Sequence, residues 1–432
     1  MNEKVFMDQY QKNFLNEEEF IAFLQEREEN SAWQREKSSE IRFLAADDQK
    51  VTIFMENEED HEMQPIIEDT MEHTRLVLKV QDSFYPVRSC AVKTILDRAR
   101  VSGNALNKVE KTVLAKILNY CMEVASGEAL LRFCEKKISA VHGGDPSDYA
   151  VLEMPELFRK TVEYLQTNFP GYTFAGASYD HSVATALWEL SNETDLLQEY
   201  RELLEKHHLQ TDGLKAGLRL TTSDVGYSGA NLYPLLFVGS GAKILPLGSP
   251  LKLEHKNGAS LEKFDSQLNL LYAQYGKALS NLEKMMSLIL LHPVNAMLGV
   301  MKRIGIPKKI AMEVAENFQQ QNGETCCSAY EVYLGITEAE HILMRDEPEG
   351  AKIVKMEENI ARAVWTIVNK VDTIYKEKCR VQLLSAVPST ILLFHLVSSF
   401  RENYAVSWHY RILRCIRIQI TGAPAENDMF YG

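Results

Sequence analysis

The sequence predicts an α+β fold, in which a mixed or antiparallel sheet with flanking helices is followed by a bundle of long helices. Two apolar or alternating runs within residues 218–236 are joined by a segment rich in turn-forming residues, which predicts a strand pair at the centre of the sheet. From residue 260 onward, apolar residues instead recur every three or four positions over about four heptads. Residues 352–378 repeat this helical pattern.

Charge is distributed unevenly along the chain. Its 432 residues are 45% hydrophobic and 25% charged, as in an ordinary soluble globular protein with two or three domains. Residues 1–72 hold 20 acidic and 7 basic residues, which leaves 40 of each sign elsewhere, so the net charge of -13 resides in this segment. We expect an acidic segment over 1–72, an α+β core over 73–257, a helical domain over 258–400 and a C-terminal strand and tail over 401–432.

The seven cysteines are scattered without C-x-x-C spacing, which favours a reducing compartment over a disulfide framework or a zinc site. The N-terminal residues lack the apolar core of a signal peptide. Two uncharged runs, 285–301 and 383–400, contain proline and histidine and are marginal in length for a bilayer, so they are predicted to be buried helices. The sequence thus predicts a cytoplasmic protein with no membrane partner.

The N-terminal part is predicted to be charged helix followed by short elements. Residues 1–40 carry a narrow apolar stripe among glutamates, which is typical either of a solvated helix or of an acidic arm that covers a basic surface and mimics nucleic acid. Residues 56–72 are predicted to be an acidic loop. The other elements predicted up to residue 142 are strands at 41–43, 51–54, 76–80, 84–87 and 136–142 and helices at 91–98 and 104–124.

Glycine and proline delimit the elements that follow. The predicted ones are a helix at 155–168, a hairpin of strands 172–178 and 183–190, a helix at 196–206, and strands at 244–247 and 251–255. Helices are then predicted at 260–289, 294–303, 308–321 and 352–378. Apolar residues alternate with polar ones over 408–420, which predicts a final strand.

Three blocks of this chain resemble a known family. They are Phe84-Tyr-Pro-Val87 with the two helices after it, residues 138–157 with Ser147-Asp-Tyr149, and the strand and turn of residues 217–228. In this order they resemble the phage- and plasmid-like proteins catalogued as domain of unknown function 932, with a weaker likeness at residues 328–338. The chain departs from the family at residues 236–242, where members continue into a strand that ends near Cys-Asn-Gly.

The resemblance spans residues 76–343 and implies a mobile-element context, in which recombination, replication and counter-defence are common roles. It brings no established activity. A further analogy, to single-strand annealing proteins, rests on that context and on the layout of a sheet followed by helices.

No catalytic residue, metal site or cofactor is predicted. Residues 226–230 differ by one residue from the Gly-x-Ser-x-Gly nucleophile elbow, and no strand-to-helix junction is evident there. A two-metal bundle needs two Glu-x-x-His pairs on facing helices and two further carboxylates. The spacing itself occurs at Glu58/His61, Glu205/His208 and Glu338/His341.

The turn shared with the family consists of Ser223, Asp224, Gly226, Tyr227 and Ser228. Its serines and aspartate can satisfy backbone donors, and its glycine permits a positive φ, so a structural role is expected. A binding loop is the alternative.

Two basic clusters are candidate nucleic-acid contacts. One surrounds a tight turn between two helices, where it could meet phosphates or form a helix-turn-helix, and contains Lys302, Arg303, Lys308 and Lys309. The other lies beside aromatic residues on the final predicted strand, a combination suited to single strands, and contains Arg411, Arg414 and Arg417. The structural alternatives are an ordinary basic corner of a helical hairpin and a strand with a basic polar face.

Three functional classes remain open from the sequence. The first is a non-enzymatic accessory protein of a phage or plasmid that binds or anneals single-stranded DNA in recombination or replication. The second is an interaction protein, such as a counter-defence or host-takeover factor, whose partner is a host or phage protein. The third is an enzyme of unidentified chemistry. Long helices and a sheet edge also permit a homo-oligomer.

Overall fold

The computed structural model describes residues 4–57, 63–190, 195–209, 211–238, 243–323, 325–346 and 350–386, with side chains to residue 368. The chain forms two compact units, residues 1–371 and 372–432. The described part of the second unit, residues 372–386, is helical. All other elements belong to the first unit.

The centre of the first unit is a seven-stranded antiparallel sheet in the order β1-β8-β9-β10-β11-β12, with β13 also paired to β11. The predicted central strand pair is confirmed as β10–β11, in which Leu220 faces Leu232 across the ladder and Ala186 on the other side. The strands are β1 (Gln11–Phe14), β8 (Thr173–Asp180), β9 (Ala184–Glu189), β10 (Lys215–Thr222), β11 (Ala230–Val238), β12 (Lys243–Pro246) and β13 (Leu251–Leu253).

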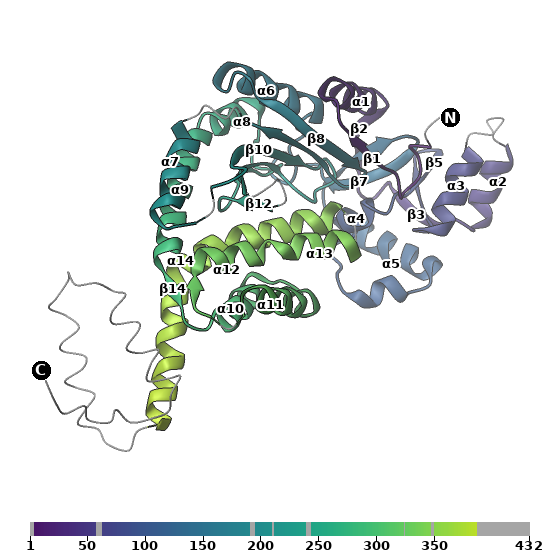
Figure 1. The fold of residues 1–432 in the computed structure, drawn as a ribbon. Helices are drawn as coiled ribbons and strands as arrows, with labels where there is room; N and C mark the ends of the chain where they lie inside the picture. The colour runs from purple at the N-terminus through teal and green to yellow at the C-terminus, as the bar shows by residue number, and fades with distance from the viewer. Residues whose placement is uncertain are drawn as a thin grey trace, which may run out of the picture. The chain divides into compact units, whose positions relative to one another are not determined.

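Helices pack against this sheet through its apolar side chains. Leu218 and Leu220 of β10 are fully buried in a core shared with these helices, and the Tyr275 hydroxyl donates to the Gly217 carbonyl. Figure 1 shows α1 and α6 on one side of the sheet and α12–α14 on the other. The helices that precede or follow strands of this sheet along the chain are α1 (Glu17–Glu29), α6 (Met154–Asn168), α7 (Asp195–Lys206), α8 (Leu261–Leu268) and α9 (Leu271–Ser287).

Two small antiparallel sheets lie beside the central one and enclose a core of their own, in which Leu78, Leu131 and Ile138 are fully buried. One sheet consists of β2 (Ser31–Lys37), β6 (Glu128–Cys134) and β7 (Lys137–Gly143), and the other of β3 (Arg42–Ala45), β4 (Leu76–Val80) and β5 (Ser83–Pro86). Their helices are α2 (Gln49–Asn57), α3 (Met63–Glu72), α4 (Ala91–Ala99), the 3-10 helix η1 (Asn104–Lys108) and α5 (Lys111–Val124).

The acidic N-terminal segment is part of these sheets, unlike the solvated helix or covering arm that its composition suggested. Strand β1 pairs with β8, β2 with β6 and β3 with β4. Two of its carboxylates, Asp8 and Asp69, contact the buried Lys137 ammonium, and Asp8 also lies 3.8 Å from Arg88. The predicted acidic loop over 56–72 is likewise wrong, because Met63–Glu72 is helix α3.

The C-terminal half is helical, as predicted. It contains a short hairpin, β14 (Ile289–Leu290) with β15 (Cys327–Ser328), and the helices α10 (Pro293–Ile304), α11 (Lys308–Asn322), α12 (Ala329–Ile336), α13 (Glu338–Asp346) and α14 (Gly350–Ala386). The single helix predicted over 260–289 is interrupted at residues 269–270, between α8 and α9. The strand predicted over 408–420 lies outside the described residues. Within the described part of the chain, no helix is both long and apolar enough to span a bilayer.

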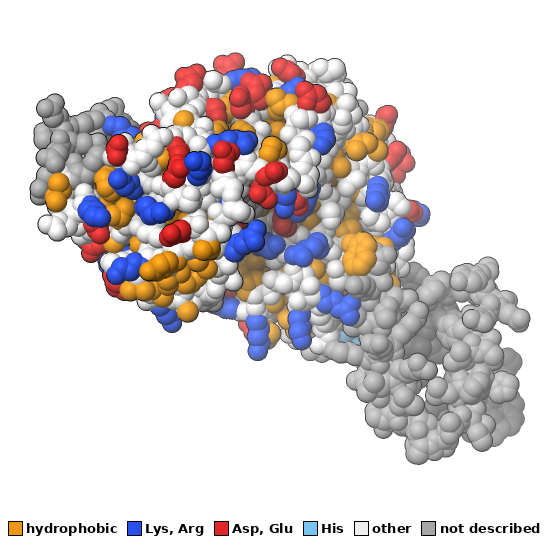
Figure 2. All heavy atoms as spheres, turned by 180° about the vertical axis from the view of Figure 1, so that it is seen from behind, with side chains coloured by type: hydrophobic (Ala, Val, Ile, Leu, Met, Phe, Trp, Pro, Cys, Tyr) orange, Lys and Arg blue, Asp and Glu red, His pale blue; other side chains and the backbone are white. Residues whose placement is uncertain are grey.

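Charged side chains are mixed over much of the surface. Figure 2 shows acidic and basic side chains interspersed over the upper part of one face. Along the lower edge of that face, lysine and arginine side chains predominate. This edge takes in the region of α5 as well as that of α10 and α11 in Figure 1.

Candidate functional site: a cleft at the β10–β11 turn and a basic groove

The turn between β10 and β11 joins the central sheet to the neighbouring small sheet. Ser223 Oγ accepts from the backbone N–H groups of Val225 (3.3 Å) and Tyr227 (3.1 Å), the local satisfaction of backbone donors that the sequence predicted. Gly226 has a φ of 82°, and a Cβ there would lie 3.3 Å from Cε1 of His142. The turn therefore requires glycine both for its backbone conformation and for its close contact with β7.

Asp224 has a partner that its position in the turn did not reveal. Its carboxylate pairs with Nε of Arg132 on β6, and Nη2 of the same arginine donates to Glu28 of α1 at 2.9 Å. The Arg132 guanidinium also lies 5.0 Å from the centre of the Trp33 ring. Burial raises the pKa of Asp224, and the Arg132 charge offsets part of this shift. One buried cation thus connects the turn, a strand and a helix.

Three rings stack in parallel behind the turn. The rings of His142 and Tyr149 lie 3.8 Å apart at 7°, and those of Tyr149 and His255 lie 5.3 Å apart at 9°. The Tyr149 hydroxyl donates to the Asp224 carbonyl at 2.9 Å. His255 contacts the Ala150 carbonyl through Nδ1 and the Thr222 hydroxyl through Nε2, each at 3.3 Å. Because its carbonyl partner can only accept, His255 holds its proton on Nδ1.

Burial sets the protonation states of this stack. It lowers the pKa of His142 and of His255 to about 4 in each case, and it raises the pKa of Tyr149 well above its usual value. All three rings are therefore neutral at pH 7. The Nε2 atom of His142 is buried and has no hydrogen-bond partner within the described structure.

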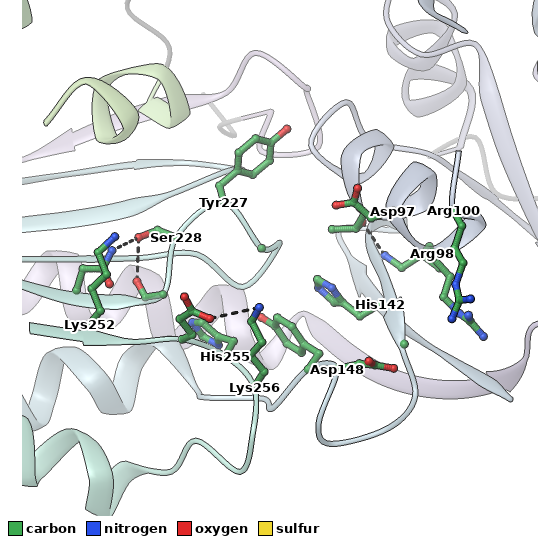
Figure 3. Close-up of a pocket in the computed structure, with 18 of the residues that line it drawn as sticks. Asp97, Arg98, Arg100, His142, Asp148, Tyr227, Ser228, Lys252, His255 and Lys256 are labelled. Atoms are coloured by element: carbon green, nitrogen blue, oxygen red, sulfur yellow. Dashed lines mark hydrogen bonds and ion pairs between the residues drawn. The ribbon is translucent and has the colours of Figure 1, made fainter. Parts of the chain in front are cut away.

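The turn and the stack border a cleft of about 530 Å³. In Figure 3, Arg98 of α4 and Arg100, which follows that helix, lie on one side, and Lys252, His255 and Lys256 on the other, with His142 between them. Two of these cations are paired, Lys252 with Glu358 (2.6 Å) and Lys256 with Glu254 (3.3 Å). Arg98 donates to the carbonyls of Ser126 and Glu128, so its guanidinium holds the strand end beside it.

The described polar groups of the cleft do not form a nucleophile–base pair. Among the described residues, no carboxylate forms an ion pair with His142 or His255. Ser228 Oγ is also engaged, since it donates to the Gly229 carbonyl and accepts from Asn231, both at 2.9 Å. A nucleophile needs an adjacent base that is itself oriented by a third group, and the described contacts contain no such arrangement.

A separate acidic cluster resembles a metal site in composition. Oxygen and nitrogen atoms of Asp8, Asp69 and His73 all lie within 4.8 Å of one another. The Lys137 ammonium contacts both carboxylates and supplies the positive charge at this position. The cluster is thus a buried ion-pair network that joins the N-terminal segment to β7.

The first predicted basic cluster is a corner between α10 and α11. Gly305 ends α10 with a φ of 85°, and Pro307 precedes α11, which gives the tight turn that the sequence predicted. All four side chains are exposed: Lys302, Arg303, Lys308 and Lys309. Lys309 pairs with Asp346 at 3.1 Å, whereas the other three form no ion pair within the described structure.

Helix α14 fixes this corner and completes a groove beside it. Arg362 Nη2 donates to the Ile304 carbonyl at 3.2 Å, and Asn359 Nδ2 donates to the Gly305 carbonyl at 3.3 Å. Arg303, Arg362 and Trp365 line an open groove of about 640 Å³, in which 57% of the Trp365 surface is exposed. A large aromatic side chain is therefore exposed beside two guanidinium groups.

The groove and the cleft are neighbours along α14. Glu358 lines the cleft, and Arg362 and Trp365 follow it at four and seven residues, which places all three on one face of the helix. At 1.5 Å per residue the stripe is roughly 10 Å long. The second predicted basic cluster, Arg411, Arg414 and Arg417, lies outside the described residues.

Comparison of the chain with protein-family models, with curated proteins and with solved structures finds no match.

Proposed function

We propose that this protein is a non-enzymatic accessory protein of a phage or plasmid, and that it binds single-stranded DNA along the stripe of α14 beside the α10–α11 corner. The observation that carries the proposal is the exposed Trp365 between Arg303 and Arg362 in one groove. Proteins that bind single strands combine an aromatic surface for base stacking with cations for the phosphates. The resemblance to phage and plasmid proteins supplies the biological context.

The lysines at the start of α11 support this proposal. The N-terminus of a helix carries partial positive charge, so lysine there is unfavourable by about 0.3–1 kcal/mol. Lys308 and Lys309 nevertheless occupy the first turn of α11, whose first turn contains no acidic residue. Asp346 offsets the charge of Lys309, and an anionic partner at this position would offset that of Lys308.

A second candidate function is small-molecule binding in the cleft. It is favoured by the volume of about 530 Å³, which lies within the roughly 300–1,000 Å³ typical of ligand pockets. Such a ligand would bind in the cleft, so substitutions in the groove should leave its affinity unchanged.

The proposal is tested by fluorescence anisotropy with a labelled single-stranded oligonucleotide at low salt. The double variant Lys302→Glu/Arg303→Glu is expected to weaken binding at least tenfold, because two phosphate contacts become repulsive. Trp365→Ala is expected to weaken it about 5- to 150-fold, the equivalent of about 1–3 kcal/mol for one stacked base. Double-stranded DNA should depend less on Trp365, because its bases are already stacked.

Lys108→Glu/Lys116→Glu is the matched control, with the same change in net charge on exposed side chains of η1 and α5. Figure 1 places α5 away from α10. The control should bind within twofold of the unmodified protein. Equal losses in both double variants would mean that net charge alone governs binding, and the groove would lose its role.

A further inference from the structure

Helix α14 packs on the sheet through a buried ion pair. Arg219 of β10 is 5% exposed and Glu357 of α14 is 3% exposed, and Nη1 of the arginine contacts the glutamate. The guanidinium lies 4.8 Å from the centre of the Tyr233 ring on the neighbouring strand. The start of α14 is held by Asp180, whose carboxylate accepts from the Gly350 N–H at 3.2 Å.

A pocket of about 260 Å³ adjoins this ion pair. Its walls are formed by β8, β9 and β10 on one side and by α13 and α14 on the other. Most of its side chains apart from the ion pair are apolar or small, and include Val183, Leu187, Met344, Ile353 and Val354. The pocket is thus a largely apolar space whose wall contains one buried guanidinium and the carboxyl groups of Asp180, Glu340 and Glu357.

Arg219 has hydrogen-bonding capacity that the protein does not use. Its Nε and Nη2 atoms are buried and have no hydrogen-bond partner within the described structure. The N–H groups of Nε and Nη2 point in parallel from one edge of the guanidinium, a geometry that matches the two oxygens of a carboxylate. Leaving both donors without a hydrogen bond in a buried position is unfavourable, and a carboxylate would satisfy both.

We propose that this pocket binds a small carboxylic acid with an apolar body, whose two oxygens accept from Nε and Nη2 of Arg219. The volume is slightly below the roughly 300 Å³ at which pockets for drug-sized ligands begin, so the ligand is a short acid. This site is separate from the groove at Trp365, and its occupant does not depend on the proposed binding of DNA.

The neighbouring carboxylates are compatible with an anionic ligand. Burial raises the pKa of Glu357 well above its usual range, the Arg219 charge offsets part of this shift, and Glu340 of α13 adds to it through its charge and a hydrogen bond. Two carboxyl groups can form a hydrogen bond only when one of them carries a proton, so Glu340 and Glu357 together hold one negative charge, which the Arg219 guanidinium balances.

Thermal unfolding of the full chain with butyrate, hexanoate and octanoate at constant ionic strength tests the proposal. Each acid that fits should raise Tm with saturation, because it binds the folded state alone. The effect should increase with chain length and then fall when the chain exceeds the pocket. Hexanol and hexylamine, which share the apolar body and lack the carboxylate, should not raise Tm.

Titration calorimetry of two variants with hexanoate tests whether the acid binds in this pocket. Arg219→Lys keeps the charge and loses the paired donors, so it should weaken binding at least tenfold. Val354→Phe fills the pocket and leaves Arg219 unchanged, so it should abolish binding. Arg201→Lys on the exposed side of α7 is the control and should bind as the unmodified protein does.

The wild-type series keeps the proposal testable even where a variant does not fold. Absence of a saturable effect from every acid on the unmodified protein overturns it. A hexylamine effect equal to that of hexanoate also overturns it, since the two glutamates rather than Arg219 would then select the ligand. Unchanged affinity in folded Arg219→Lys and Val354→Phe places the acid elsewhere and has the same consequence.

Discussion

Two arginines, Arg132 beside the β10–β11 turn and Arg303 at the α10–α11 corner, are in opposite environments. The Arg132 side chain is 4% exposed and contacts two carboxylates and an indole ring, while Arg303 is exposed and has no ion pair within the described structure. A buried and matched charge stabilises the fold, and its loss leaves its partners uncompensated. An exposed and unmatched charge contributes little to folding and is available to a partner. The difference separates residues that hold the structure from residues proposed to act.

The largest expected effect is the response of the cleft to pH. Burial lowers the pKa of His142 and His255 to about 4, so the unfolded chain takes up their protons first as the pH falls. Their contribution to stability is therefore fully present above about pH 6.5 and is lost as the pH falls to about 4, by about 3 kcal/mol for each histidine. Urea unfolding between pH 4.5 and 7 measures this loss.

The control for this prediction is His255→Asn, which removes one of the two titrating groups. Its free energy of unfolding should fall less steeply with acidification than that of the unmodified protein. The difference between the two slopes should correspond to the uptake of at most one proton. Identical pH dependence of the two proteins would show that His255 is not held neutral by burial. The corner contains only lysine and arginine, so its binding to DNA should not change over this pH range.

The next largest effect is expected when the arginine of each region, Arg132 or Arg303, is replaced by methionine. Arg132→Met leaves Asp224 and Glu28 without their cation and should lower the free energy of unfolding by about 3–5 kcal/mol. Arg303→Met should change it by no more than about 0.5 kcal/mol, because the side chain is exposed. Chemical denaturation measures both values. Similar losses from the two variants would remove the distinction between the regions.

A smaller effect is expected for glycine to alanine. Gly226→Ala should lower the free energy of unfolding by about 1–2 kcal/mol, because its φ of 82° is unfavourable for alanine and its Cβ would contact His142. Gly299→Ala is the matched control within α10, where a Cβ would have no atom within 4 Å. It should stabilise the protein by up to about 1 kcal/mol through helix propensity. Equal effects would mean that the turn does not constrain Gly226.

The fold class and the central strand pair were predictable because they depend on local patterns. Alternation around Leu218 and Leu220 identified β10, and the turn residues identified the break before β11. The interruption between α8 and α9 was not predictable, because Leu268 and Leu271 continue the apolar spacing across it. The N-terminal segment was misread for another reason, since composition does not reveal that Asp8 is paired with Lys137 from a distant strand.

The site was predictable only in part. The turn roles of Ser223 and Gly226 follow from residue chemistry and were found. The partners of the turn come from distant elements, Arg132 from β6 and His255 from the segment after β13, and no local pattern indicates them. Trp365 was overlooked although a signal existed, because its spacing from Arg362 places an aromatic and a basic residue on the same polar face of a predicted helix.

The salt dependence of binding to single-stranded DNA tests the central claim most directly. The logarithm of the binding constant should fall linearly with the logarithm of salt concentration, with a slope of about -0.7 for each neutralised phosphate. In Lys302→Gln/Arg303→Gln the slope should become shallower by about 1.4, because two contacts are lost. A slope that does not change in this variant, or no binding by the unmodified protein at low salt, would contradict the assignment of the groove.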